Sequence, residues 1–272
     1  MPCAAAYTIG YIRIPSYVPN SFNNALTQLQ REVAFFQQNT DGLVIDEMRN
    51  PGGSVCYDEA VVSYFMTDTW RPLGFQLRAT PNWMAQFAFS LQSAQDQGSP
   101  QWVINLYTAY LKEVQQALAE NRGMTGPLPL CGESFDLSPA VDRTGKKISY
   151  TKSLIVLMDE MSASGADAFP AMMQDNGRGL MVGYRTMGAG GSVADVDGTI
   201  YSAGSTSVTQ SLMNRKNPVV TSDFPTTFYV ENVGVRPDVQ IDYMTKDNLL
   251  QRGKPFTDAF TQVIVDQIKT SR

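Results

Sequence analysis

Ser164 is the side chain in this sequence best placed to act as a nucleophile. It follows an apolar run at 154–159 and opens the stretch SGADAFPAMMQDNGRG. In open α/β sheets, ligands gather beyond the carboxyl ends of the strands. One interpretation makes Ser164 the cap of the following helix through its hydroxyl. The other makes it a catalytic serine, with the N–H of Gly165 facing a developing oxyanion. The spacing alone leaves both interpretations open.

A second glycine-rich turn offers further donors for the same chemistry. RNPGGSV, residues 49–55, follows the apolar segment 43–46. It is either a tight turn after a buried strand or the source of a second oxyanion N–H, from Gly52 or Gly53. Two such turns at the ends of two parallel strands can assemble an oxyanion hole across a sheet.

The usual partners of catalytic serines and of metals are missing. The chain contains no histidine, which removes the most common general base, metal ligand and pH switch together. The cysteines Cys3, Cys56 and Cys131 are odd in number and lack metal-ligand spacing, so we interpret them as buried or incidental thiols. GAGG at 188–191 lacks the Lys-Ser/Thr of a phosphate loop, and we interpret it as a flexible or substrate-facing loop. We expect no metal and no cofactor.

Composition narrows the class of protein. The chain has 272 residues, 43% hydrophobic residues and a formal charge of −5, typical of a globular protein with no basic face for nucleic acid. We find no apolar run of roughly 18 residues, so no membrane-spanning helix is expected. Met1-Pro2-Cys3 runs directly into a strand-like segment, and we therefore expect the chain to be a C-terminal fragment of a longer protein.

The elements that must hold these residues alternate between strands and helices. Period-two and period-3.6 patterns predict strands near 7–14, 43–46, 154–159 and 180–184, and helices over 21–39, 57–66 and 255–270, with a β-rich section at 199–242. The segment 72–132 reads as a mostly helical insertion, in which Ser99 caps a helix and Pro100 takes its first position. We predict one α/β domain over residues 1–272, with parallel strands backed by helices.

Three motifs together resemble a known family. GLVIDEMRNPGGSV, SASGADAFPAMMQDNGRGLMVGYRTMGAGG and VENVGVRPDVQID occur in the order seen in C-terminal processing (tail-specific) serine proteases. The resemblance touches about half of the chain and leaves the 72–132 insertion uncovered. It implies a ClpP/crotonase-like fold and a serine-type endopeptidase.

The resemblance is greatest to the branch of the chlamydial protease-like activity factor (CPAF), with the archaeal tricorn protease core more distant. The lysine base of the tail-specific branch falls on Ala189 here, so a Ser-Lys pair is absent. The CPAF branch uses Ser, His and Glu, which implies Ser164 as nucleophile and Glu231 as the glutamate. It also implies oxyanion donors at Gly165 and at the Gly52–Gly53 turn.

Two acids would be unremarkable without the resemblance. Glu231 would otherwise be taken as a surface glutamate. Asp167 lies in the first turn after Ser164, where an acid favours the helix dipole, and the resemblance adds a role in substrate binding. The histidine of the CPAF branch comes from a segment upstream of this domain, so we expect this chain by itself to be nearly inactive.

The sequence therefore predicts the catalytic domain of a serine endopeptidase with a peptide or protein substrate. The alternative is a non-catalytic peptide-binding module that retains the protease fold. Acyl-CoA chemistry of the crotonase type lacks a suitable acid pair on the oxyanion turns. The resemblance suggests an extracytoplasmic or secreted location and raises a homodimer as an expectation.

Overall fold

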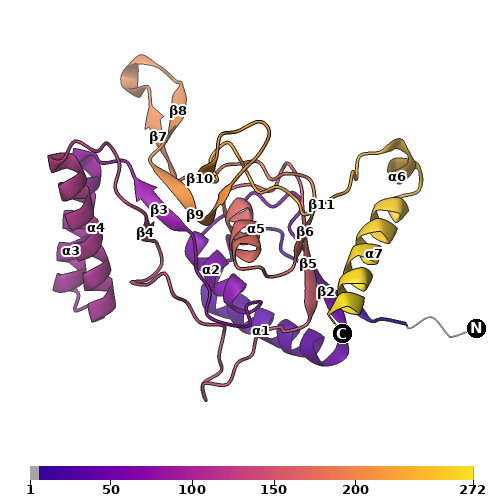
Figure 1. Cartoon of the computed structure of the whole chain (residues 1–272). Coiled ribbons are helices and arrows are strands. Elements are labelled where there is room, and N and C mark those ends of the chain that lie inside the picture. The colour runs from indigo at the N-terminus through magenta and orange to yellow at the C-terminus, as the bar shows by residue number, and fades with distance from the viewer. Residues whose placement is uncertain (1–5, 272) are drawn as a thin grey trace, which may run out of the picture. The chain divides into compact units, whose positions relative to one another are not determined.

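The computed structural model describes residues 6–271 (Figure 1). The chain separates into two compact units, each built from several stretches. The first unit consists of Met1–Arg71, Asp136–Ala189 and Asn232–Arg272, and the second of Pro72–Phe135 and Gly190–Glu231. The segment for which we predicted a helical insertion thus forms most of one stretch of the second unit.

The first unit is organised around a parallel sheet. Its five strands lie in the order β1 (Ile9–Arg13), β2 (Gly42–Asp46), β5 (Ser153–Met158), β6 (Leu180–Gly183) and β11 (Val239–Gln240). Every neighbouring pair is parallel. Because all strands point the same way, their carboxyl ends meet at one edge, where the turns after β2 and β5 carry the predicted site residues.

Helices cover both faces of this sheet, as Figure 1 shows. The elements are α1 (Phe22–Asn39), α2 (Val55–Ser63), α5 (Gly165–Asp175), α6 (Lys246–Leu250) and α7 (Lys254–Thr270). On the α7 face, Val44, Ile155 and Leu157 pack with Phe260 and Ile264. These strand residues alternate with neighbours that point to the opposite face, as the period of a strand requires. β2 and β5 are therefore buried on both sides.

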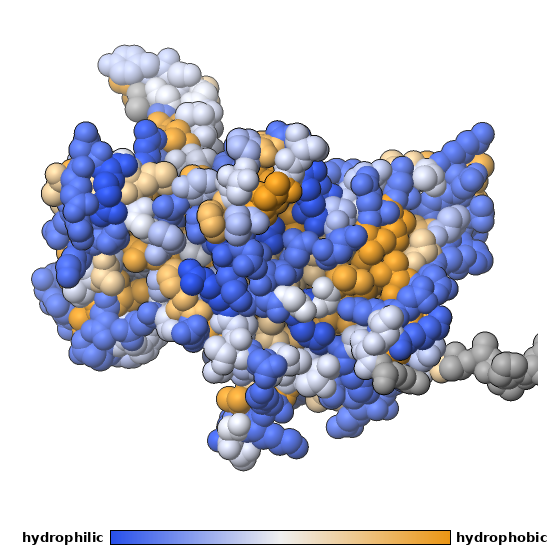
Figure 2. Space-filling view, in the orientation of Figure 1, coloured by the Kyte–Doolittle hydropathy of each residue, from blue (hydrophilic) through white to orange (hydrophobic). Residues whose placement is uncertain are grey.

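An apolar hollow of about 480 Å³ lies beside the edge strand β1 of the first unit, lined among others by Ile9, Tyr11, Phe256 and Phe260. Figure 2 shows apolar side chains gathered next to α7. The hollow does not include the glycine turns after β2 and β5.

The second unit combines an antiparallel sheet with two hairpins. The sheet has the order β10 (Thr227–Tyr229), β9 (Ser211–Val219), β3 (Gly74–Leu77) and β4 (Leu128–Pro129). α3 (Pro81–Asp96) and α4 (Gln101–Ala119) form a helical hairpin whose core includes Phe87, Tyr110 and Val114. β7 (Val193–Asp197) and β8 (Ser205–Thr209) form a separate two-stranded sheet, joined by the short 3-10 helix Thr199–Tyr201.

The structure confirms the predicted strands and helices and corrects two local predictions. α4 begins at Gln101 with Pro100 as its N-cap and no side-chain cap, so Ser99 does not cap this helix. Cys56 and Cys131 are both disulfide-bonded, so they are not incidental thiols. Cys3 lies outside the described residues. Among residues 6–271, no helix combines the length and apolar character needed to cross a bilayer.

Candidate active site

Ser164 occupies the sharp turn between β5 and α5. Its backbone has φ 57° and ψ −109°. Residues other than glycine rarely adopt this conformation, which costs of order 1–3 kcal/mol. The side chain is partly exposed. Its hydroxyl donates no hydrogen bond to any residue between 6 and 271. The turn therefore presents a hydroxyl whose proton is available, at the cost of local strain.

Two unpaired amides lie beside this turn. The N–H groups of Gly53 and Gly165 have no acceptor within the described part of the chain, although Gly165 is buried. A side-chain carbon built on Gly165 would fall 3.2 Å from the nitrogen of Gly53, and one built on Gly52 would fall 2.6 Å from the nitrogen of Gly165. Unpaired buried amides are rare in folded proteins. The two glycine turns predicted from the sequence are thus in direct contact.

Asn50 and Tyr17 hold the first of these turns, and neither is among the site residues predicted from the sequence. The Asn50 side chain donates to Ile14 O (2.9 Å) and accepts from the N–H of Gly52 (2.8 Å). Its main-chain oxygen accepts from the N–H of Ala163 (2.9 Å), which links the turn after β2 to the turn before Ser164. An Asn before Pro-Gly is a recognisable turn signal, whereas nothing marks Tyr17.

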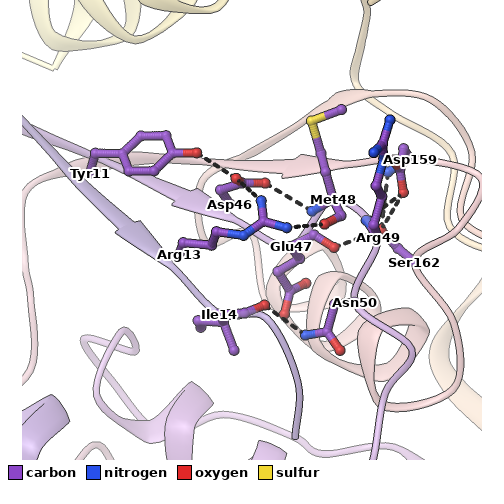
Figure 3. A network of polar contacts seen from close by, with 10 residues as sticks. All are labelled: Tyr11, Arg13, Ile14, Asp46, Glu47, Met48, Arg49, Asn50, Asp159 and Ser162. Carbon is purple, nitrogen blue, oxygen red and sulfur yellow. Dashed lines mark hydrogen bonds and ion pairs between the residues drawn. The ribbon is translucent and has the colours of Figure 1, made fainter.

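The last residue of β2 and the residues that follow it form a polar network, shown in Figure 3. Asp46 accepts from Tyr11, from Arg13 and from the N–H of Met48. Next along the chain, the main-chain oxygen of Glu47 accepts from the hydroxyl of Ser162 (2.9 Å). These contacts tie β1, β2 and the loop after β5 together at the carboxyl edge of the sheet.

Asp167 lies in the first turn of α5 and hydrogen-bonds back to the residue before the helix. Its carboxylate is fully buried and accepts four hydrogen bonds: from the N–H of Ser164 (2.8 Å), Gly188 (2.9 Å) and Ala189 (2.9 Å), and from the hydroxyl of Thr186. It therefore fixes both the backbone of Ser164 and the start of the GAGG loop. Burial raises the pKa of Asp167, and these hydrogen bonds oppose the rise. The expected substrate contact stays a prediction.

Three more carboxyl groups are buried near the turns. Glu47 follows β2, and Asp58 and Glu59 lie on α2; all three are nearly or fully buried. Burial raises the pKa of Glu47 and of Asp58 well above the usual range, with neighbouring carboxylates adding to the effect. Burial raises the pKa of Glu59 to about 8. No group of three or more His, Cys, Asp or Glu within residues 6–271 could hold a metal ion.

Glu231 is the last residue of the second unit, whereas Ser164, Gly165, Asp167 and the Gly52–Gly53 turn belong to the first. Its carboxylate accepts from the hydroxyl of Thr209 (3.5 Å). The next residue, Asn232, belongs to the first unit and donates its N–H to Gly188 O (2.8 Å). The convergence of Glu231 with Ser164 stays a prediction.

Comparison with known proteins gives a consistent picture. The model of peptidase family S41 matches residues 8–241. A protein of Chlamydia trachomatis is 28% identical over 89% of this chain, and one of Chlamydia muridarum is 30% identical over 89%. The match covers 42% of each of these relatives, so the chain spans less than half of their length.

Solved structures with the same fold include mature CPAF. That structure superposes with a TM-score of 0.78 at 24% identity, covering 96% of this chain and 52% of the other. A photosystem II D1 C-terminal processing protease superposes with a TM-score of 0.51 at 18% identity, covering 89% and 44%. The predicted α/β fold of the ClpP/crotonase type and the predicted family resemblance are confirmed.

Proposed function

This chain belongs to peptidase family S41, and from that membership we propose that it is the catalytic domain of a serine endopeptidase with Ser164 as nucleophile. The hydroxyl of Ser164 attacks the carbonyl carbon of an extended peptide. The peptide nitrogen leaves with a proton, and water then hydrolyses the acyl-enzyme. The substrate is a peptide or protein.

One observation carries this proposal: a strained serine lies next to two N–H groups that have no acceptor among residues 6–271. A carbonyl oxygen that becomes negatively charged needs donors already in place, because reorganising them during the reaction would raise the barrier. The N–H groups of Gly53 and Gly165 are free to take that role. The first-turn position of Gly165 in α5 adds the favourable end of the helix dipole.

Because these 272 residues contain no histidine, we propose that a histidine supplied by a segment outside them acts as the general base. We assign Glu231 the role of orienting that imidazole and stabilising its cation. Support comes from the chain path: Glu231 directly precedes Asn232, which is hydrogen-bonded to Gly188, and Gly188 donates to Asp167 at the start of α5. By itself the chain is expected to react slowly.

Chemical rescue tests the assignment. The purified chain is incubated with a fluorophosphonate probe, with and without free imidazole, and labelling is followed by mass spectrometry. We expect slow labelling that imidazole accelerates by about tenfold or more, because it supplies the missing base. Ser164→Ala should abolish labelling. Glu231→Gln should reduce the acceleration by about tenfold, because the imidazole loses its orienting acid.

Ser138→Ala is the control, because Ser138 is an exposed serine of the same unit. It should label as the unchanged chain does. Equal labelling of the Ser164→Ala variant would refute the nucleophile. A folded chain that is never labelled, with or without imidazole, would instead favour a peptide-binding module, a candidate that the missing histidine supports.

A further inference from the structure

We propose that Glu47, acting through Tyr17, is a positioning residue for the oxyanion turn Pro51–Ser54. This role rests on the proposed function, since it concerns the same donors. It adds two buried side chains, neither of which touches the reacting atoms, to the residues on which catalysis depends.

The main chain of Tyr17 is bonded to both sides of the turn. Its N–H donates to Gly52 O (2.9 Å), and its oxygen accepts from the N–H of Ser54 (2.9 Å), so the two bonds flank Gly53. Tyr17 and Gly53 are accordingly paired as an isolated parallel bridge. The direction of the Gly53 N–H therefore follows the position of the Tyr17 backbone.

The ring of Tyr17 lies against the backbone of Gly165, which carries the second N–H donor. A side-chain carbon on Gly165 would come within 3.0 Å of the Tyr17 ring. The ring also stacks on Phe169 of α5, with centroids 6.2 Å apart, and meets Tyr57 of α2 edge-on. One fully buried residue thus contacts both the Gly52–Gly53 turn and the first residue of α5.

Glu47 fixes the position of this ring by binding its hydroxyl group. The Tyr17 hydroxyl donates to Glu47 Oε1, and Glu47 is completely buried. The backbone of Glu47 is held independently, because its N–H donates to Leu157 O and its oxygen accepts from Ser162. Figure 3 shows Glu47 between Asp46 and Asn50 in the segment that leads to the turn. The acceptor for Tyr17 therefore has a fixed position in the sheet edge.

The surroundings of Glu47 favour its neutral form. The negative charges of Asp58 on α2 and Asp167 on α5 raise the pKa of Glu47, and Glu59 raises the pKa of Asp58 in the same way. No lysine or arginine of the described residues acts on Glu47. Its second oxygen, Oε2, has no partner among residues 6–271. A buried carboxylate without a cation is strongly disfavoured, so Glu47 holds Tyr17 as a carboxylic acid. The hydrogen bond between the Tyr17 hydroxyl and the Glu47 carboxyl group is the clamp. Ionisation would place a charge beside Asp58 and Asp167, and their repulsion would displace the Glu47 side chain and loosen the clamp.

Amide hydrogen exchange of the whole chain measures the clamp directly. The protection factors of the residue 17 and residue 54 amides report the two bonds that flank Gly53. Tyr17→Phe should lower both by about tenfold or more, since it removes only the hydroxyl. Tyr150→Phe is the matched control: Tyr150 is equally buried, but its hydroxyl meets the neutral Thr40. It should leave both protection factors within about twofold.

Glu47 variants separate positioning from packing. Glu47→Gln keeps an acceptor for Tyr17 without an ionisable group and should retain protection, whereas Glu47→Ala should lose it. In the unchanged chain, protection of both amides should fall as the pH rises and Glu47 ionises, and in Glu47→Gln it should stay constant with pH. The first comparison tests the contact and the second tests its protonation.

The proposal is overturned if Tyr17→Phe leaves protection unchanged, if Glu47→Gln loses as much as Glu47→Ala, or if the unchanged chain shows no pH dependence that Glu47→Gln removes. None of these measurements uses a probe or a substrate. A failure here therefore leaves the labelling of Ser164 unaffected, and a failure of that labelling leaves the clamp to be judged on its own.

Discussion

Gly52 illustrates how closely the two turns approach each other. Its φ is 90°, and a methyl group at this position would fall within 2.6 Å of the Gly165 nitrogen and 2.7 Å of the Ser164 Cβ. Both the backbone conformation and the space exclude a side chain. The requirement for glycine here comes from the neighbouring turn as much as from its own.

We predict that Gly52→Ala lowers the free energy of unfolding by about 3 kcal/mol or more, combining backbone strain with overpacking. Urea denaturation measures the change. Gly177→Ala is the control, because Gly177 has a φ of 66° but nothing within 4 Å, and it should cost only about 1 kcal/mol. Equal losses for both variants would show that crowding against Ser164 contributes nothing.

The sequence pointed to Ser164, Gly165 and Gly52 because small residues that follow apolar runs mark sharp turns at strand ends. It gave no sign of Tyr17 or Glu47. A tyrosine in a proline-flanked loop and a glutamate after a strand resemble surface residues in a sequence. Only the pairing of distant segments buries them, and that pairing is a property of the folded chain.

Among the elements, α5 depends on a single acid at its start. Asp167 accepts from three backbone N–H groups and one hydroxyl, and asparagine has only one acceptor oxygen. We predict that Asp167→Asn lowers the free energy of unfolding by about 2 kcal/mol, because amide hydrogens would face other donors. Urea denaturation tests this. Asp266→Asn, on the exposed face of α7, should change it by less than about 0.5 kcal/mol.

α2 makes stability depend on pH. Its residue Glu59 has a pKa raised by burial from 4.5 to about 8. The folded chain therefore binds this proton more tightly than the unfolded chain does. Its contribution to stability is complete below about pH 4.5 and is lost as the pH rises toward 8. We predict that Glu59→Gln stabilises the chain relative to the unchanged protein by roughly 2–4 kcal/mol at pH 8 and by much less at pH 5.

Denaturation at several pH values measures this difference. Glu133→Gln serves as control, because Glu133 is exposed and should give the same difference at every pH. A Glu59→Gln variant that is destabilised most at pH 8 would mean that the ionised carboxylate has a stabilising partner.

The elements themselves were largely predictable, because alternation and helical periodicity are local. The exceptions have local causes too. α4 begins one position later than expected. Pro100 has an extended backbone, with ψ 145°, so it is the residue before the helix and not the first residue in it. The cysteines were harder, since pairing depends on positions in space that the spacing of Cys56 and Cys131 does not reveal.

For the molecule as a whole, the disulfide-bonded cysteines imply sensitivity to reductant. Removing a disulfide commonly costs about 2–4 kcal/mol. We predict that a reducing agent lowers the melting temperature of the chain, as measured by circular dichroism. Cys56→Ser should melt at the same temperature with and without reductant. If the unchanged chain is equally insensitive, Cys56 and Cys131 contribute nothing to stability.

The order of strands in the parallel sheet also has a consequence for synthesis. β2 pairs with β1 on one side and β5 on the other, yet all of Pro72–Phe135 is translated between β2 and β5. A nascent chain that has just left the ribosome thus carries an apolar strand whose second neighbour has not been made. During that interval β2 is an open edge, and open edges are prone to pair with strands of other chains.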